Sequence, residues 1–168
     1  MSADAEVPTF RDPLVERLAR FIHDIGLRIE PARLEAASFL PGILVRDGAI
    51  LVDEAQLAWP GDLLHEAGHL AVSPPDVRAA LPAVGDDPAE EMAALAWSYA
   101  AARHLGIDPA IVFHPAGYKG GAAALLAAFE FSQGPGLPIL EWLGMTLGRR
   151  AAAAAGAEPF PRMLRWLR

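Results

Sequence analysis

The chain contains no cysteine among its 168 residues, so disulfide bonds and thiolate metal sites are excluded. A chain without disulfides suits a reducing compartment, and we expect a cytoplasmic protein. Any bound metal ion would have to be held by histidine, aspartate or glutamate side chains.

The sequence also lacks two features of exported and membrane proteins. Its first ten residues, MSADAEVPTF, contain neither a basic leader nor an apolar segment, so we expect no signal peptide. The longest apolar run, residues 122–129, is far shorter than the roughly 20 residues that a helix needs to cross a bilayer. We therefore expect no membrane span.

Basic residues are scarce relative to acidic ones. Lysine and arginine total 14 against 21 aspartates and glutamates, which gives a formal net charge of −7. Because phosphate backbones repel a negatively charged protein, direct binding of nucleic acid is not expected. The main basic cluster lies near the C-terminus, where we expect a solvated helix face; it comprises Arg149, Arg150, Arg162, Arg165 and Arg168.

Apolar residues make up 53% of the chain, which indicates a folded protein, and the length suits a single domain with one core. Periodicity and turn residues predict an α+β fold that is mainly helical with a small β-sheet. The elements expected in the first half are a helix from Asp12-Pro13 to Gly26, a short helix over about 31–38, and a hairpin of Ile43–Arg46 and Ala49–Val52 around an Asp47-Gly48 turn.

The clearest helix in the second half is DDPAEEMAALAWSYAAARHLG, with Asp87 as its cap, Pro88 in its first turn and Gly106 at its end. Further short helices are expected in AAALLAAFEF and ILEWLGMTLG, the second prolonged by the alanine run at 151–155, and a last amphipathic turn in PRMLRWLR. Large apolar side chains near the C-terminus are expected to pack in the core, with a partner surface as the alternative; they include Trp142, Met145 and Leu147.

The segment LLHEAGHLAV, residues 63–72, carries the most specific chemical signal. On a helix, His65 and His69 lie one turn apart on the same face and can direct ring nitrogens at one metal ion. Glu66 then lies beside them, where it can reach a metal-bound water as a general base. A chain of this composition contains such a pattern by chance about 0.01 times. The competing interpretation is a half-buried helix whose histidines are hydrogen-bonded in the core.

Two histidines leave a catalytic zinc one protein ligand short. The acidic start of the next strong helix, DDPAEEM, is the obvious source of a third. Glu91 is favoured because it lies above a small-to-apolar face suited to packing on the histidine helix. Glu90 is the alternative, although its spacing from Asp87 is that of a capping box, which would occupy its carboxylate on the backbone. Asp86 and Asp87 are weaker candidates.

The order of these segments resembles that of the ImmA/IrrE-type zinc metallopeptidases. The hairpin GILVRDGAILVDE, the HEAGH helix and the alanine-rich helix EMAALAWSYAA follow one another as in that family, over residues 12–105. The resemblance implies a zincin-like α+β fold and a bound Zn²⁺. It further implies His65, His69 and Glu91 as ligands and Glu66 as general base. Residues 106–168 would be a helical C-terminal extension of unknown role.

These observations predict a zinc-dependent peptidase that hydrolyses a protein or peptide substrate through a metal-activated water. His114 and Tyr118, in the glycine-rich segment FHPAGYKGG, are candidates to stabilise the oxyanion of the transition state. The alternative hypothesis is a metal-binding regulatory or interaction module with little or no hydrolytic activity. A homo-oligomer is compatible with either hypothesis.

Overall fold

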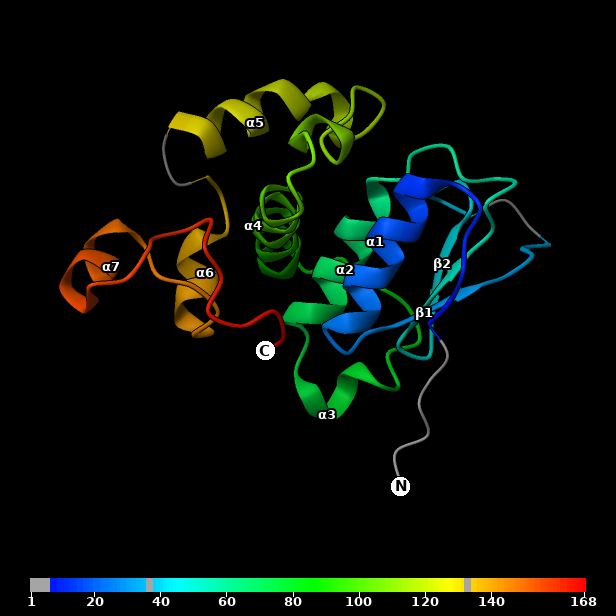
Figure 1. The fold of residues 1–168 in the computed structure, drawn as a ribbon, viewed down its shortest axis with the longest axis horizontal. Helices are drawn as coiled ribbons and strands as arrows, with labels where there is room; N and C mark the ends of the chain where they lie inside the picture. Colours follow the sequence, from blue (N-terminus) through cyan, green and yellow to red (C-terminus); the bar gives the residue numbers. More distant parts are fainter. Residues whose placement is uncertain (1–6, 36–37, 132–133) are drawn as a thin grey trace.

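A computed structural model describes residues 7–35, 38–131 and 134–168 (Figure 1). It has the α+β class expected from the sequence, with helices packed around one small sheet. The elements are α1 (Pro13–Asp24), β1 (Arg28–Pro31), β2 (Ile43–Arg46), β3 (Ala49–Val52), α2 (Asp62–Val72), α3 (Pro75–Arg78), α4 (Pro88–Leu105), the 3₁₀ turns η1 (Pro109–Ile111) and η2 (Tyr118–Gly120), α5 (Ala122–Phe131), α6 (Leu137–Trp142) and α7 (Arg149–Ala155).

The sheet has the strand order β1-β3-β2, with β3 in the centre. β2 and β3 form the predicted antiparallel hairpin. Its turn residues, Asp47 and Gly48, have positive φ angles of 49° and 70°, as a type I′ turn requires. β1 runs parallel to β3, with Arg28 opposite Ala49. A parallel neighbour cannot be read from local sequence, because its partner lies some twenty residues along the chain.

The helix expected over 31–38 is absent from the part of that stretch that the structure describes. Pro31 ends β1 instead of opening a helix, and residues 32–34 have no regular structure; positions 36–37 lie outside the described residues. Asp53 explains this local conformation. Its carboxylate accepts a hydrogen bond from the Leu34 amide, and Gln56 donates to the Leu34 carbonyl, so the backbone here is bonded to the end of β3.

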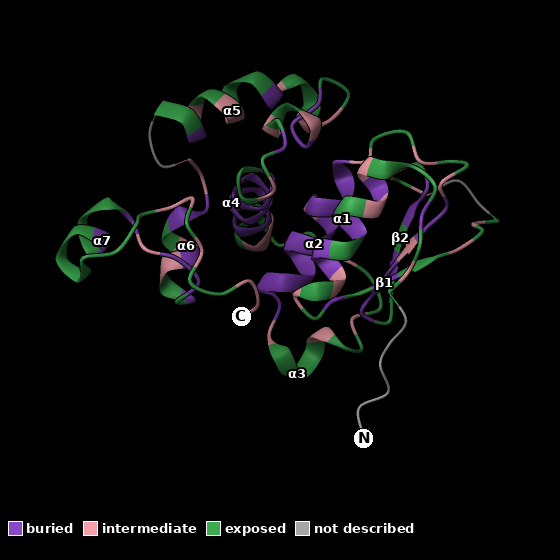
Figure 2. Ribbon diagram, viewed as in Figure 1, coloured by how far each residue is buried: buried purple, intermediate pink, exposed green. Residues whose placement is uncertain are grey.

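The core is layered from the sheet outward. α1 and α2 lie against the sheet, α4 packs on α2, and α6 packs on the far side of α4, as Figure 1 shows. The residues along these contacts are almost all buried (Figure 2). α2 is buried on nearly every side, with only His65 partly accessible among its residues, so the histidine helix is a central element of the fold.

The α4 helix begins and ends as the sequence predicts. The Asp87 carboxylate accepts a hydrogen bond from the Ala89 amide, and Pro88 occupies the first turn. Gly106 ends the helix in the left-handed conformation at φ 64°. Because these signals fix where α4 starts, they also fix the position of the two glutamates in its first turn.

The C-terminal region departs from the sequence prediction. α6 and α7 are separate helices, because Gly144 at φ 69° and an irregular stretch lie between them. PRMLRWLR forms no helix and pairs with the rest of the chain through the Thr146–Met163 bridge. Met145 is buried as expected, whereas Trp142 is 78% exposed.

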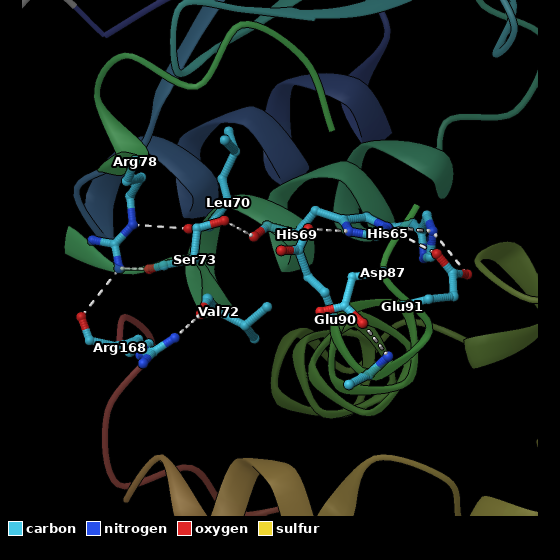
Figure 3. A network of polar contacts seen from close by, with 11 residues as sticks. His65, His69, Leu70, Val72, Ser73, Arg78, Asp87, Glu90, Glu91 and Arg168 are labelled. Atoms are coloured by element: carbon cyan, nitrogen blue, oxygen red, sulfur yellow. Dashed lines mark hydrogen bonds and ion pairs between the residues drawn. The ribbon is translucent and has the colours of Figure 1, made fainter. Parts of the chain in front are cut away.

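The C-terminal arginines do not form one helix face. Arg149 and Arg150 lie on α7, while Arg165 donates to the Leu143 carbonyl and Arg168 caps carbonyls at the end of α2. Arg78 also donates to carbonyls of that same turn, including that of Leu70 at 2.8 Å (Figure 3). The C-terminal end of the histidine helix is thus held by the Arg78 guanidinium and by the backbone amide and guanidinium of Arg168, which satisfy carbonyls that have no partner within the helix.

In the described part of the chain, the structure contains no helix with the length and apolar character needed to cross a membrane.

Candidate metal centre

The α2 helix brings the two histidines of the HEAGH motif together. The Nε2 atoms of His65 and His69 lie 3.2 Å apart, and their rings are close to perpendicular, with centroids 4.8 Å apart. His69 is only 2% exposed, whereas His65 is partly accessible. Both reactive nitrogens therefore face one point at the edge of the core (Figure 3).

The α4 helix contributes Glu91 to the same point. Its Oε1 lies 3.4 Å from Nε2 of His65, and its Oε2 lies 3.0 Å from Nε2 of His69. The candidate ligand atoms of the three side chains all lie within 4.8 Å of one another, so this group could hold a metal ion. The third residue favoured from the sequence is thus the one that lies beside both histidines.

The spacing of these atoms matches a tetrahedral metal site. With metal–ligand bonds of about 2.0–2.2 Å, the ligand atoms of a tetrahedral site lie about 3.3–3.6 Å apart. Of the three observed separations, 3.4 Å falls in that range, and 3.2 and 3.0 Å fall slightly below it. An ion would fit after outward movements of a few tenths of an ångström. The two distances to Glu91 end on different carboxylate oxygens, so either oxygen could complete one face of the tetrahedron with the two Nε2 atoms and leave the fourth corner to another ligand.

Glu90 lies on the opposite side of the His69 ring. Its Oε1 is 3.0 Å from Nδ1, whereas Glu91 faces Nε2. Contrary to the capping-box interpretation, its carboxylate contacts the imidazole of His69 rather than the backbone of Asp87. A carboxylate at Nδ1 fixes the tautomer and ring orientation of a histidine so that Nε2 is free to bind a metal. Glu90 is therefore suited to support His69.

Charge pairing dominates the electrostatics of this cluster. Hydrogen bonds to His65 and His69 hold the pKa of Glu91 well below its usual range. Burial lowers the pKa of His69, but the hydrogen bonds to Glu91 and Glu90 outweigh it, so that the pKa lies above its ordinary value. The carboxylates around the two rings make this an anionic cluster of side chains, which favours a cation.

Glu90 and Glu91 both contact the histidine rings. Glu66 differs from them, because none of the described residues donates a hydrogen bond to its carboxylate. It is 9% exposed, and burial raises its pKa, opposed by the charges of His65 and His69. A carboxylate of this kind can accept a proton at a pH closer to neutrality than an exposed glutamate can.

Gly68 explains how α2 and α4 approach so closely. A Cβ atom at this position would lie 2.9 Å from the carbonyl oxygen of Ala94 and 3.3 Å from the Trp97 ring. Any larger residue would push α4 outward and carry Glu91 away from the histidines. The glycine inside the motif is therefore a packing requirement of the site.

Of the two residues expected to stabilise a transition state, Tyr118 lies against the cluster and His114 has another partner. The Tyr118 ring meets the His65 ring edge-on, with centroids 5.9 Å apart. Burial, with the negative charges of Asp62, Glu91 and Glu66, raises the pKa of Tyr118, so its hydroxyl stays protonated. Nε2 of His114 is instead hydrogen-bonded to Asp62 at 2.9 Å.

The Asp62–His114 pair was not predicted from the sequence. Asp62 lies in the first turn of α2, where the helix dipole favours a negative charge. Its side chain is nevertheless buried, and burial raises its pKa while the hydrogen bond to His114 opposes the rise. The spacing of 52 residues between the partners leaves no local signal.

Comparison with known proteins adds no further information: no family model, no curated protein and no solved structure matches this chain.

Proposed function

We propose that this protein is a zinc-dependent peptidase with a zincin-like fold, related to the ImmA/IrrE-type metallopeptidases. The observation that carries the proposal is the triangle of His65, His69 and Glu91, with separations of 3.0–3.4 Å between donor atoms from two helices. Two imidazoles and one carboxylate are a ligand set of catalytic zinc sites, in which a fourth position stays open. The succession of hairpin, HEAGH helix and Glu-led helix supports the relationship.

A zinc ion bound by these three residues would lower the pKa of a water molecule and polarise a peptide carbonyl. Glu66 would take a proton from the attacking water and deliver it to the leaving amine. Burial favours both steps, because it raises the pKa of Glu66. A carboxyl whose pKa lies closer to the working pH can both accept and release a proton. Its freedom from other hydrogen bonds among the described residues supports this role.

Tyr118 is the residue best suited to stabilise the oxyanion. Its hydroxyl is a hydrogen-bond donor at neutral pH, as in any protonated tyrosine, and its ring lies beside His65. One well-placed donor of this kind contributes about 10²–10³-fold to turnover. His114 is less suited, because its Nε2 is already bonded to a buried carboxylate.

The test compares zinc-loaded wild-type protein with Glu66→Gln on a peptide library, with cleavage read by mass spectrometry. We expect cleavage by the wild type and a loss of about 10²–10⁴-fold in Glu66→Gln, with zinc content unchanged. Glu130→Gln, an exposed position on α5, is the matched control and should retain full activity. Equal background from all three proteins, with zinc bound to each, would favour the metal-binding regulatory module instead.

A further inference from the structure

Asp62 and His114 form a buried, hydrogen-bonded pair next to the candidate metal centre. Oδ1 of Asp62 lies 2.9 Å from Nε2 of His114, and each side chain is 7% exposed. An aspartate in the first turn of a helix is ordinarily stabilised by solvent and the helix dipole, and it needs no buried partner. Burial of the Asp62 carboxylate is unfavourable because the charge loses its water. A surface aspartate would not have this desolvation penalty, which the hydrogen bond to His114 offsets.

The pair joins two elements that are far apart in sequence. Asp62 is three residues before His65 and therefore lies on the same side of α2. His114 begins the segment 114–121, which contains η2 and with it Tyr118. Within the described residues, this bond is the side-chain hydrogen bond that ties the segment 114–121 to the histidine helix.

Two further contacts fix the His114 ring. Trp59 stacks on it almost in parallel, with centroids 4.3 Å apart and planes 4° apart. Gly117 approaches its edge, where an added Cβ would lie 3.3 Å from Cε1. The amide of Gly117 also donates to the His114 carbonyl at 3.1 Å. The turn that precedes Tyr118 is thus folded around the imidazole.

Tyr118 itself has a conformation that only such surroundings would maintain. Its φ is 57°, and that of Lys119 is 51°, a region that side chains other than glycine and asparagine rarely adopt. Residues held in this region persist when their surroundings over-determine them, and they concentrate at functional sites. The ring contacts of Tyr118 with His65 and Phe113 then place it at the metal centre.

We propose that Asp62 and His114 are positioning residues, whose buried hydrogen bond fixes the segment 114–121 on α2 and so holds Tyr118 against His65. The role of Tyr118 in turnover rests on the proposed function, but its position does not. The structural part can therefore be tested without metal and without substrate.

The chain offers a direct probe because it contains only two tyrosines. In protein labelled with fluorotyrosine, the ¹⁹F spectrum shows one resonance for Tyr99 and one for Tyr118, and Tyr99→Phe assigns them. Asp62→Ala and His114→Phe should shift the Tyr118 resonance toward its position in the unfolded chain and leave Tyr99 unmoved. His114→Phe keeps an aromatic ring for Trp59 to stack on, so it isolates the hydrogen bond. Asp62→Asn, which retains an acceptor oxygen, should restore the wild-type position.

Two control variants and one further test variant bear on whether a shift is specific. Asp12→Ala removes the carboxylate that caps α1, away from the site, and should leave both resonances in place. Gly117→Ala keeps both members of the pair but presses on the ring, and should shift Tyr118 even if Asp62→Ala does not fold. Gly85→Ala adds a Cβ that meets nothing within 4 Å, so the Tyr118 resonance should stay in place in this control. An unmoved Tyr118 resonance in folded Asp62→Ala, or in Gly117→Ala, would overturn the proposal.

Kinetics separate this proposal from the proposed function. If both hold, Tyr118→Phe and Asp62→Ala each lower kcat by about 10²-fold with little change in KM, and the double variant loses no more than either. Additive losses would show that Asp62 does not act through Tyr118. If no protein cleaves peptides but the ¹⁹F shifts appear, the peptidase proposal fails and the positioning role stands.

Discussion

The carboxylate of Glu90 and the imidazole of His69 are joined at 3.0 Å through Nδ1, while Nε2 of the same ring faces His65 and Glu91. Successive glutamates of α4 thus contact opposite sides of one histidine. Glu91 is placed to bind an ion directly, and Glu90 is placed to orient the ring that binds it.

This arrangement predicts different effects for the two glutamates. Glu90→Ala should weaken zinc binding by about 10–100-fold, the usual effect of removing a carboxylate behind a metal-bound histidine. Glu91→Ala removes a ligand and should weaken it further. A competition titration against a chromophoric chelator measures both. The assignment would be reversed if Glu90→Ala lost more affinity than Glu91→Ala.

Zinc should stabilise the folded protein. An ion that binds only the native state, at 100 times its Kd, adds about 2.7 kcal/mol to the free energy of unfolding. For a chain of this size that corresponds to a rise in Tm of about 5–10 °C. Scanning calorimetry with zinc and with chelator measures the difference. The rise in Tm should vanish in the double variant His65→Ala/His69→Ala. A rise that persists in this variant would show that the zinc binds elsewhere.

Gly68→Ala separates helix propensity from packing. Alanine is favoured over glycine inside a helix by about 1 kcal/mol. At this position, however, its Cβ would meet the backbone oxygen of Ala94 at 2.9 Å, and a backbone atom cannot move aside cheaply. We expect a net loss of about 1–3 kcal/mol in denaturant unfolding, together with weaker zinc binding. Gly85→Ala is the control, and a stabilised Gly68→Ala would contradict the close packing of α2 and α4.

Much of the candidate site could be predicted because its signals are local. The histidine spacing of HEAGH, and the Asp87 and Gly106 boundaries of α4, depend on a few adjacent residues and on helix geometry. The choice of Glu91 over Glu90 followed from the face of α4 on which it lies. The hairpin was equally local, since its Asp-Gly turn fixes the register of both strands.

What the sequence did not predict depends on partners distant along the chain. β1 was not predicted, and its last residue, Pro31, was expected to open a helix, because the structure of this strand comes from pairing with β3. The partner of Asp62 is 52 residues away, and Glu90 was assigned to a backbone cap because its true contact, with His69, crosses between helices. The irregular C-terminal segment is held by Trp97, which donates to the Trp166 carbonyl, rather than by helix propensity.

Asp53 predicts a pH dependence of stability. Hydrogen bonds from the Leu34 amide and then from Gln56 lower its pKa below the ordinary value. A carboxyl whose pKa is depressed by folding stabilises the native state above its unfolded pKa, and this contribution is lost as the pH falls through the folded pKa. The free energy of unfolding of Asp53→Asn should therefore be lower than that of wild type at about pH 6, and the gap should narrow below about pH 4. Denaturant titrations across this range measure the gap, and a gap independent of pH would contradict the role of the charge.

The central claim is that one ion is bound jointly by α2 and α4. Anomalous diffraction at the zinc edge, from crystals of the zinc-loaded protein, tests it most directly. We predict a single strong peak about 2.0–2.2 Å from Nε2 of His65, Nε2 of His69 and a carboxylate oxygen of Glu91. A zinc-loaded crystal without a peak between these three side chains would contradict the claim.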